Sequence, residues 1–297
     1  MHEGRASRTA EHMALFRALE AGRPVERRLF ADPFAPLFLG GSFRLVTRAA
    51  RLPGVRACIV RFIDARWPGA RTSAIARTRL IDDWLLAAIA AGLDQLVLLG
   101  AGFDARAYRL PEAEWLRVFE VDHPATLARK RAALGRAPGA RLGHVVFVPV
   151  DFTRGSLAEA MKSAGYERGA RTAFVWEGVT NYLSLQAVDA VLEWFAASRA
   201  GNPVIFTYVH RDVLEHPQRF PDMRRVSAIL RRNDETWTFG LDPAHVPGYL
   251  AAHGLELLED LGATDYRARV GCLPNLGYEF YRAVRARSGS SVLRGRP

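Results

Sequence analysis

The chain has 297 residues, of which 49% are hydrophobic and 24% charged, the balance of a soluble globular protein. No apolar run approaches the roughly 18 residues that a membrane span needs, and no apolar core follows the charged first residues. We therefore expect no membrane partner, no secretory signal and a cytoplasmic location. The net charge is +10, but nearly every basic residue is an arginine and the arginines are spread along the chain, which argues against a nucleic-acid partner.

Residues 1–92 show a helical pattern interrupted by Pro24, Pro33, Pro36, Pro53 and Pro68. This pattern predicts a set of short helices that form a helical cap over the rest of the chain. The last helix is expected over 73–91, with Ser73 as its N-cap and Gly92 as its stop. Cys58, which falls in this cap, and Cys272 lie far apart without a CxxC partner, so we expect two core residues rather than a disulfide or a zinc site.

After residue 92, short apolar runs alternate with helical stretches. Five runs typical of strands cover 95–99, 116–121, 144–149, 173–176 and 204–209. A helix at 243–252 precedes two further runs, 255–258 and 278–284, which are close enough in sequence to form an antiparallel edge. This alternation predicts an α/β fold with a doubly wound, mostly parallel seven-stranded sheet.

The core is therefore expected over 93–287. The segment 210–240, which contains prolines and aromatic residues, is expected to cover the carboxyl ends of the strands, where open α/β sheets bind ligands. The Ser/Gly-rich end, 288–297, is expected to be a flexible tail.

The first strand runs directly into Gly100-Ala-Gly102, a turn whose glycines let the backbone approach a ligand closely. With Ala105 the motif also fits a nicotinamide dinucleotide, and a tight turn without any ligand remains a further alternative. Asp104 disfavours the dinucleotide, because a carboxylate at a helix N-terminus opposes a pyrophosphate. S-adenosylmethionine carries an ammonium and a sulfonium but no phosphate, so the acidic residue is compatible with it.

Acidic residues end the next three strands. Glu120 and Asp122 lie about 20 positions after the glycine turn, where a ribose diol expects its acceptor, and strand alternation sends both to the same side. Asp151 could accept from an adenine amine beside Phe152, and Glu177 would need a partner such as a ligand ammonium. Taken singly, Asp151 is equally consistent with a solvated loop carboxylate, which is also the alternative for Glu120 and Asp122.

The helix before the first strand places one arginine on its inward face. Arg77 shares that face with Ile81 and Trp84, whereas Arg79 shares the opposite face with Asp83. A buried guanidinium requires an anionic partner. The carboxylate of an amino-acid-like ligand would supply one, and an internal salt bridge is the alternative.

Taken together, these segments resemble the leucine carboxyl methyltransferase-like group of class I methyltransferases, which includes bacterial O-methyltransferases of natural-product pathways. The matching segments begin at Arg77, Leu99, Glu120, Val150 and Glu177, and Lys130 follows the third of them. The resemblance implies a Rossmann-like class I methyltransferase fold. The third-strand region and the segment after Tyr208 depart from the protein-methylating eukaryotic members, so a phosphatase tail is not the expected acceptor.

The resemblance also implies residue roles toward S-adenosylmethionine. Arg77 would hold the methionine carboxylate, Gly100 and Gly102 would line the methionine moiety, and Glu177 would lie at its end. Asp122 would bind the ribose, and Asp151 and Phe152 the adenine. Tyr182 resembles a tyrosine that approaches the acceptor.

The predicted function is S-adenosylmethionine-dependent O-methylation of a carboxylate or hydroxyl on a small-molecule, secondary-metabolite or peptide acceptor. No metal is required, because the methyl group is already activated. Tyr182 and His210 are the candidate catalytic residues on the acceptor side, since a hydroxyl acceptor would benefit from a base. An NAD(P)-dependent oxidoreductase and a non-catalytic cofactor-binding protein are the alternatives.

Overall fold

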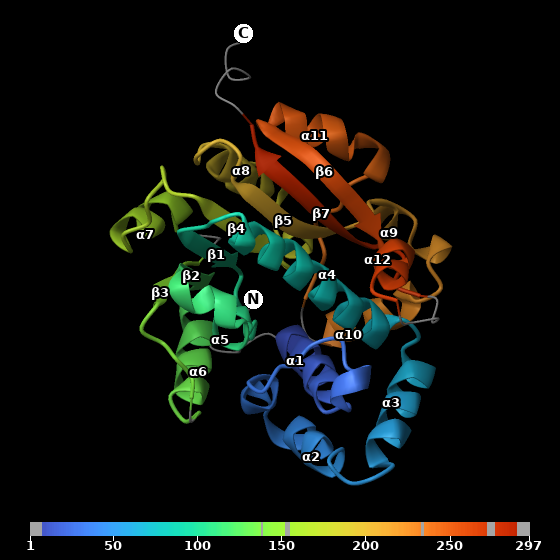
Figure 1. Ribbon diagram of the computed structural model, residues 1–297. Helices are drawn as coiled ribbons and strands as arrows, with labels where there is room; N and C mark the ends of the chain where they lie inside the picture. Colours follow the sequence, from blue (N-terminus) through green and yellow to red (C-terminus); the bar gives the residue numbers. More distant parts are fainter. Residues whose placement is uncertain (1–7, 138, 152–154, 233–234, 272–276, 290–297) are drawn as a thin grey trace.

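The computed structural model describes residues 8–137, 139–151, 155–232, 235–271 and 277–289 (Figure 1). Within them one seven-stranded sheet has the order β3-β2-β1-β4-β5-β7-β6. The strands are β1 Gln95–Leu99, β2 Arg117–Asp122, β3 Val145–Pro149, β4 Thr172–Trp176, β5 Pro203–Val209, β6 Leu255–Gly262 and β7 Tyr281–Ser288. Strands β1 to β5 are parallel, and β7 runs antiparallel to both of its neighbours. The prediction of a doubly wound, mostly parallel sheet is confirmed.

The sheet is buried on both faces because its central strands are apolar at most positions. In β1, Leu96 and Leu98 belong to one hydrophobic cluster, and the alternate residues Val97 and Leu99 belong to another. The first cluster includes residues of α1 (Arg8–Ala21), α4 (Ala70–Ala90) and α12 (Ala263–Arg269). The second includes residues of α7 (Leu157–Ser163), α8 (Leu185–Ala196) and α11 (Val246–Ala252).

The segment expected to form a helical cap is helical before β1. Besides α1 and α4 it contains two α-helices and two 3-10 helices: α2 Gly41–Ala49, α3 Val55–Arg66, η1 Val25–Arg27 and η2 Ala35–Phe38. Helix α4 begins three residues earlier than predicted, after Gly69 in a left-handed conformation (φ 79°). Ser73 is therefore an internal helix residue, and its hydroxyl lies 2.5 Å from that of Tyr266.

The remaining helices are short and follow the strands. They are α5 Arg106–Arg109, η3 Pro111–Trp115, α6 Pro124–Leu134, η4 Thr180–Tyr182, α9 Asp212–Glu215, η5 Pro217–Arg219, α10 Met223–Arg232 and η6 Pro243–His245. The expected cover segment contains α9, η5 and α10. Its buried residues Val213, Met223 and Val226 pack with Val209 at the end of β5, which places this segment beyond the carboxyl ends of the strands.

Two further expectations concern the C-terminal end and the cysteines. Strand β7 continues through Ser288, whose amide donates to Asn202 O, so this residue belongs to the sheet rather than to the expected tail. Residues 290–297 and Cys272 lie outside the described residues. Cys58 is exposed on α3 rather than buried, so that prediction was wrong. Among the described helices, none is long and apolar enough to cross a membrane.

Candidate active site

The turn after β1 depends on glycine for its shape. Gly100 and Gly102 adopt positive φ angles of 62° and 43°, which side chains other than glycine rarely adopt. A Cβ at Gly100 would also collide with the side chain of Val179, which follows β4. The turn therefore brings bare backbone to the carboxyl edge of the sheet, as the sequence predicted.

Asp122 lies directly against this turn. Its carboxylate accepts from the Gly102 amide and from the His123 amide, each at 2.6 Å. Burial raises the pKa of Asp122, although both amide hydrogen bonds oppose that shift. The carboxylate at the end of β2 is thus fixed beside the glycine turn.

Glu120 occupies a different environment, although it lies two positions earlier on the same strand. It is completely buried and pairs with the equally buried Lys130 at 2.8 Å. Burial raises the pKa of Glu120 to about 7, against the effect of Lys130. Lys130 Nζ also lies 3.4 Å from Ala101 O in the turn. Of the two carboxylates that the sequence left open, Asp122 is the one at the carboxyl edge of the sheet, beside the glycine turn.

Arg77 points inward, as its helical periodicity predicted. Its side chain is 7% exposed, and its Nε donates to Glu177 Oε1 at 2.8 Å. The guanidinium carbon lies 4.2 Å from the ring centre of Tyr281 on β7. The internal salt bridge that was one of the two alternatives is therefore present, and its partner is itself a predicted site residue.

Arg106 is a residue of this edge that the sequence reasoning missed. It is 2% exposed and donates to Asp82 at 2.8 Å, to Glu177 Oε2 at 2.9 Å and to Asp104. Burial raises the pKa of Glu177, but Arg106 and Arg77 together hold it below its usual value. Asp104 also accepts from the Arg106 amide at 2.8 Å, so it binds both the side chain and the backbone of the first residue of α5. Glu177 is thus ionised and held from two sides.

The third strand leads to Asp151. Val150 donates its amide to Asp122 O, and Gly155 donates to Asp151 O, so this segment runs beside the end of β2. Asp151 is partly exposed there. Phe152 lies outside the described residues.

Tyr182 connects the turn after β4 to the cover segment and to α1. Its hydroxyl donates to Glu235 Oε2 at 3.2 Å, and the hydroxyl of Thr9 donates to the same oxygen at 2.6 Å. Burial raises the pKa of Tyr182, and Glu235 adds to this effect. The phenol is therefore neutral near pH 7.

His210 follows β5 and has a local structural partner. Its Nδ1 accepts from the Asp212 amide at 3.1 Å, and its own amide donates to Phe280 O. The Gly178 amide donates to Thr207 Oγ1, so Thr207 is level with the end of β4. His210 lies three residues further, about 10 Å along the strand direction.

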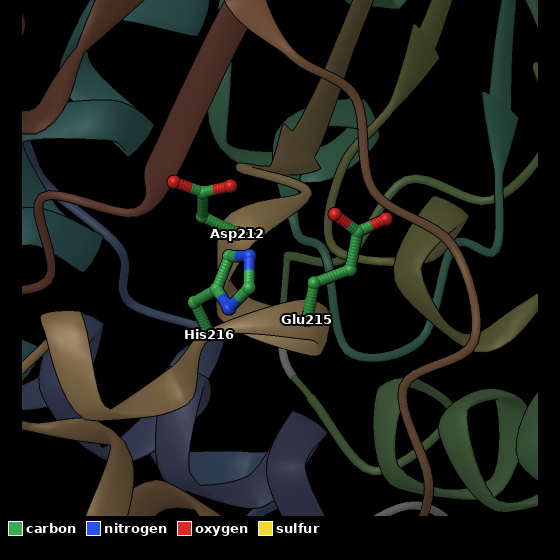
Figure 2. Close-up of side chains that lie close together, drawn as sticks. All are labelled: Asp212, Glu215 and His216. Carbon is green, nitrogen blue, oxygen red and sulfur yellow. The ribbon is translucent and has the colours of Figure 1, made fainter.

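The same segment contains a group of three side chains that could hold a metal ion. Figure 2 shows Asp212, Glu215 and His216 close together at α9. Glu215 and His216 are exposed, and Asp212 already pairs with Arg219 at 2.5 Å. That hydrogen bond lowers the pKa of Asp212. The group carries no further sign of a metal site.

Comparison with known proteins identifies the family of this chain. The sequence profile of the family described as leucine carboxyl methyltransferase matches residues 10–196. The chain belongs to this family. A Streptomyces coelicolor protein named as an S-adenosyl-L-methionine-dependent methyltransferase is 34% identical over 249 residues, covering 84% of this chain and 82% of that protein. A similarly named protein of Mycobacterium tuberculosis is 32% identical over 244 residues, covering 77% and 74%.

Solved structures give more distant similarities to this leucine carboxyl methyltransferase family member. An O-methyltransferase family protein from Burkholderia thailandensis is 13% identical, with a TM-score of 0.46 and coverage of 74% of this chain and 60% of that one. The family and the strand order together define a Rossmann-like class I methyltransferase fold. The protein is an S-adenosylmethionine-dependent methyltransferase. The alternative of an NAD(P)-dependent oxidoreductase is therefore excluded.

The residues at the sheet edge fit this methyl donor. The turn at Gly100 carries no side chain, and Asp122 at the end of β2 and Glu177 directly after β4 come from the two strands that flank β1. Carboxylates suit a ligand that carries hydroxyls, an ammonium and a sulfonium, whereas they oppose a pyrophosphate. The carboxylates at this edge of the sheet therefore agree with the family assignment.

Proposed function

We propose that this protein methylates an oxygen atom, of a carboxylate or a hydroxyl, on a small-molecule or peptide acceptor, most naturally a secondary metabolite. Membership in a methyltransferase family supports methyl transfer, and the observation that supports the cofactor site is Glu177, directly after β4, held by Arg77 and Arg106. No nucleic-acid partner is proposed, since the positive charge of the chain is not accompanied by a recognition motif.

We propose the contacts to S-adenosylmethionine that the resemblance to the family implies. Arg77 binds Glu177 through Nε, and its Nη groups would donate to the methionine carboxylate. Glu177 would accept from the methionine ammonium, and the backbone at Gly100 and Gly102 would line that moiety. Asp122 would bind the ribose hydroxyls. Asp151, with Phe152, would contact the adenine.

The chemistry then depends chiefly on positioning. When bound, S-adenosylmethionine supplies a methyl group that is already activated by the sulfonium. The protein has to hold the acceptor oxygen in line with that methyl group and to exclude water. Tyr182, a neutral phenol at the junction of α1, the turn after β4 and the cover segment, is proposed to contact the acceptor.

His210 is the second candidate on the acceptor side. Because Nδ1 accepts the Asp212 amide, a neutral ring carries its proton on Nε2 and presents a donor. In that tautomer His210 would hold an acceptor oxygen by a hydrogen bond. It could act as a base only after losing the bond to Asp212, and a carboxylate acceptor would need no base.

Calorimetric titration of S-adenosylmethionine tests the cofactor site. Arg77→Ala should weaken binding by about tenfold or more, because a charge-assisted hydrogen bond contributes roughly 1.5–3 kcal/mol. Arg79→Ala is the matched control, since Arg79 lies on the exposed face of the same helix and pairs with Asp83. Binding of NAD in place of S-adenosylmethionine, or equal losses in both variants, would contradict the assignment.

The acceptor requires a separate assay. Methyl transfer from labelled S-adenosylmethionine should be measured with matched carboxylic acids, phenols, alcohols and amines. Product formed on an oxygen would support the proposal, and product formed only on nitrogen would overturn its oxygen specificity. Tight cofactor binding without transfer across the panel would instead favour a non-catalytic binding protein.

A further inference from the structure

The hairpin formed by α2 and α3, residues 41–66, carries an unbalanced positive charge. It contains six arginines and a single acidic residue, Asp64. Asp64 is already paired with Arg71 on α4, at 2.7 Å. Most of the hairpin's positive charge is therefore left without a neighbouring carboxylate on the hairpin itself.

Large apolar side chains are exposed on the same hairpin. Leu45 on α2, Leu52 in the turn and Phe62 on α3 are 65%, 60% and 66% exposed. The exposed arginines Arg48 and Arg51 lie between the first two in sequence, and Arg61, also exposed, precedes Phe62. Apolar and cationic side chains thus alternate along one protruding segment.

The position of the hairpin leaves this surface accessible. In Figure 1, α2 and α3 lie at the end of the molecule away from the sheet, outside α1 and α4. The inward side of the hairpin packs on the main hydrophobic core through Phe43, Val46, Ile59 and Ile63. The hairpin is anchored from within, and its outward side chains face solvent.

We propose that this hairpin binds an anionic lipid surface, with its arginines on lipid phosphates and its exposed apolar side chains between the head groups. Guanidinium groups bind phosphate through paired hydrogen bonds, and amphipathic basic helices lie at membrane interfaces in this manner. Arginines that would meet the phosphates alternate along the hairpin with exposed apolar side chains that would enter the head-group region, which matches this interfacial arrangement. The sequence predicted no membrane partner because exposure of these residues is a property of the fold.

Vesicle co-sedimentation of the full chain tests the proposal. The wild type should sediment with vesicles that contain phosphatidylglycerol and phosphatidylcholine, and not with phosphatidylcholine alone. Arg48→Glu combined with Arg51→Glu should reduce the partition by at least about tenfold, and Leu52→Ser combined with Phe62→Ser should also reduce it. Thermal unfolding of each variant checks that the fold is kept.

The control variant carries the same change of charge at a site away from the hairpin. Arg168→Glu combined with Arg199→Glu alters two exposed arginines near the amino ends of β4 and β5 and should leave the partition unchanged. An equal loss in this control would show attraction by net charge alone and would overturn the assignment to the hairpin. A wild type that ignores anionic vesicles but is retained by immobilised polyglutamate would assign the face to an acidic protein and overturn the lipid proposal.

Discussion

Glu120 and Asp122 lie two positions apart on β2, and the fold gives their carboxylates different surroundings. Asp122 accepts two amides beside the glycine turn, whereas Glu120 is completely buried against Lys130. Alternation along a strand sends both to one face, so sequence pattern alone could not separate them. They differ in position along the strand, because only Asp122, at the end of β2, reaches the carboxyl edge of the sheet.

The burial of Glu120 predicts a pH dependence of stability. Burial raises its pKa from 4.5 to about 7, so the native state binds a proton that the unfolded chain has released between those values. The proton on Glu120 therefore contributes its full stabilisation of the native state below about pH 4.5. This stabilisation is lost as the pH rises through 7, which lowers the free energy of unfolding by up to ~3 kcal/mol. Glu120→Gln should reduce the pH dependence of the free energy of unfolding between pH 4.5 and 7. Glu112→Gln, at an exposed position, is the control, and an unaltered slope in Glu120→Gln would contradict the prediction.

Tyr182 carries a second prediction at this scale. Tyr182→Phe removes the hydroxyl that binds Glu235, so kcat/KM for methyl transfer should fall about tenfold while the affinity for S-adenosylmethionine is unchanged. Tyr249→Phe is the matched control, because its hydroxyl binds Asp189 between α8 and α11. A loss of cofactor affinity in Tyr182→Phe would place the residue on the cofactor side instead.

The sequence predicted some site residues better than others for physical reasons. Arg77 lies on a long helix, where a period of 3.6 residues identifies the inward face. Arg106 lies on a helix of four residues, too short for any periodicity, so its burial between Asp82 and Glu177 could not be inferred. The segment Gly-Phe-Asp-Ala-Arg contained a signal, because a buried turn with adjacent opposite charges indicates pairing.

At the scale of elements, the turn between β1 and α5 sets the geometry of the site. Gly100→Ala should destabilise the protein by about 1–3 kcal/mol, since φ is positive and the new Cβ meets Val179. It should also weaken S-adenosylmethionine binding, because the turn must shift. Gly143→Ala, where a Cβ meets nothing within 4 Å, should be neutral in both denaturant unfolding and calorimetry. Equal behaviour of the two variants would refute the argument.

Elements whose residue pattern is determined by burial were predicted closely from the sequence. The five parallel strands are apolar runs with both faces covered, so their positions were visible as such. The start of α4 was not predicted, because Ser73 gave a local N-cap signal. The helix begins instead after Gly69, which is left-handed and packs so closely against Gly277 that a Cβ would not fit. Contacts between residues so distant in sequence lie outside any local pattern.

At the scale of the molecule, charge is distributed unevenly. The chain has a net charge of +10, yet the carboxylates Asp122, Asp151 and Glu177 gather at one edge of the sheet. Arg77 and Arg106, on neighbouring helices, pair with Glu177, and other arginines remain on the surface. The basic composition therefore describes the exterior and does not predict the ligand.

Cofactor binding should stabilise the whole fold, since α1, α4 and the strand ends all contribute to the site. S-adenosylmethionine at about 100 times its Kd should add about 2.7 kcal/mol and raise Tm by roughly 5 °C. Differential scanning calorimetry measures this shift, and Arg77→Ala at the same concentration should show a smaller one. A larger shift with NAD would contradict the family-based assignment.

The ion pairs of Arg77 and Arg106 with Glu177 also limit where the chain can be cut into separate fragments. Arg77 comes from the helical cap, Arg106 from the α/β core, and both are buried on one carboxylate. Cutting the chain near residue 92 would leave Glu177 and Arg106 in one fragment without Arg77, and would open the hydrophobic cluster that α4 shares with β1. The cap is thus not a removable module. Fragments for expression, circular permutants and chimeras should keep α4 with the sheet.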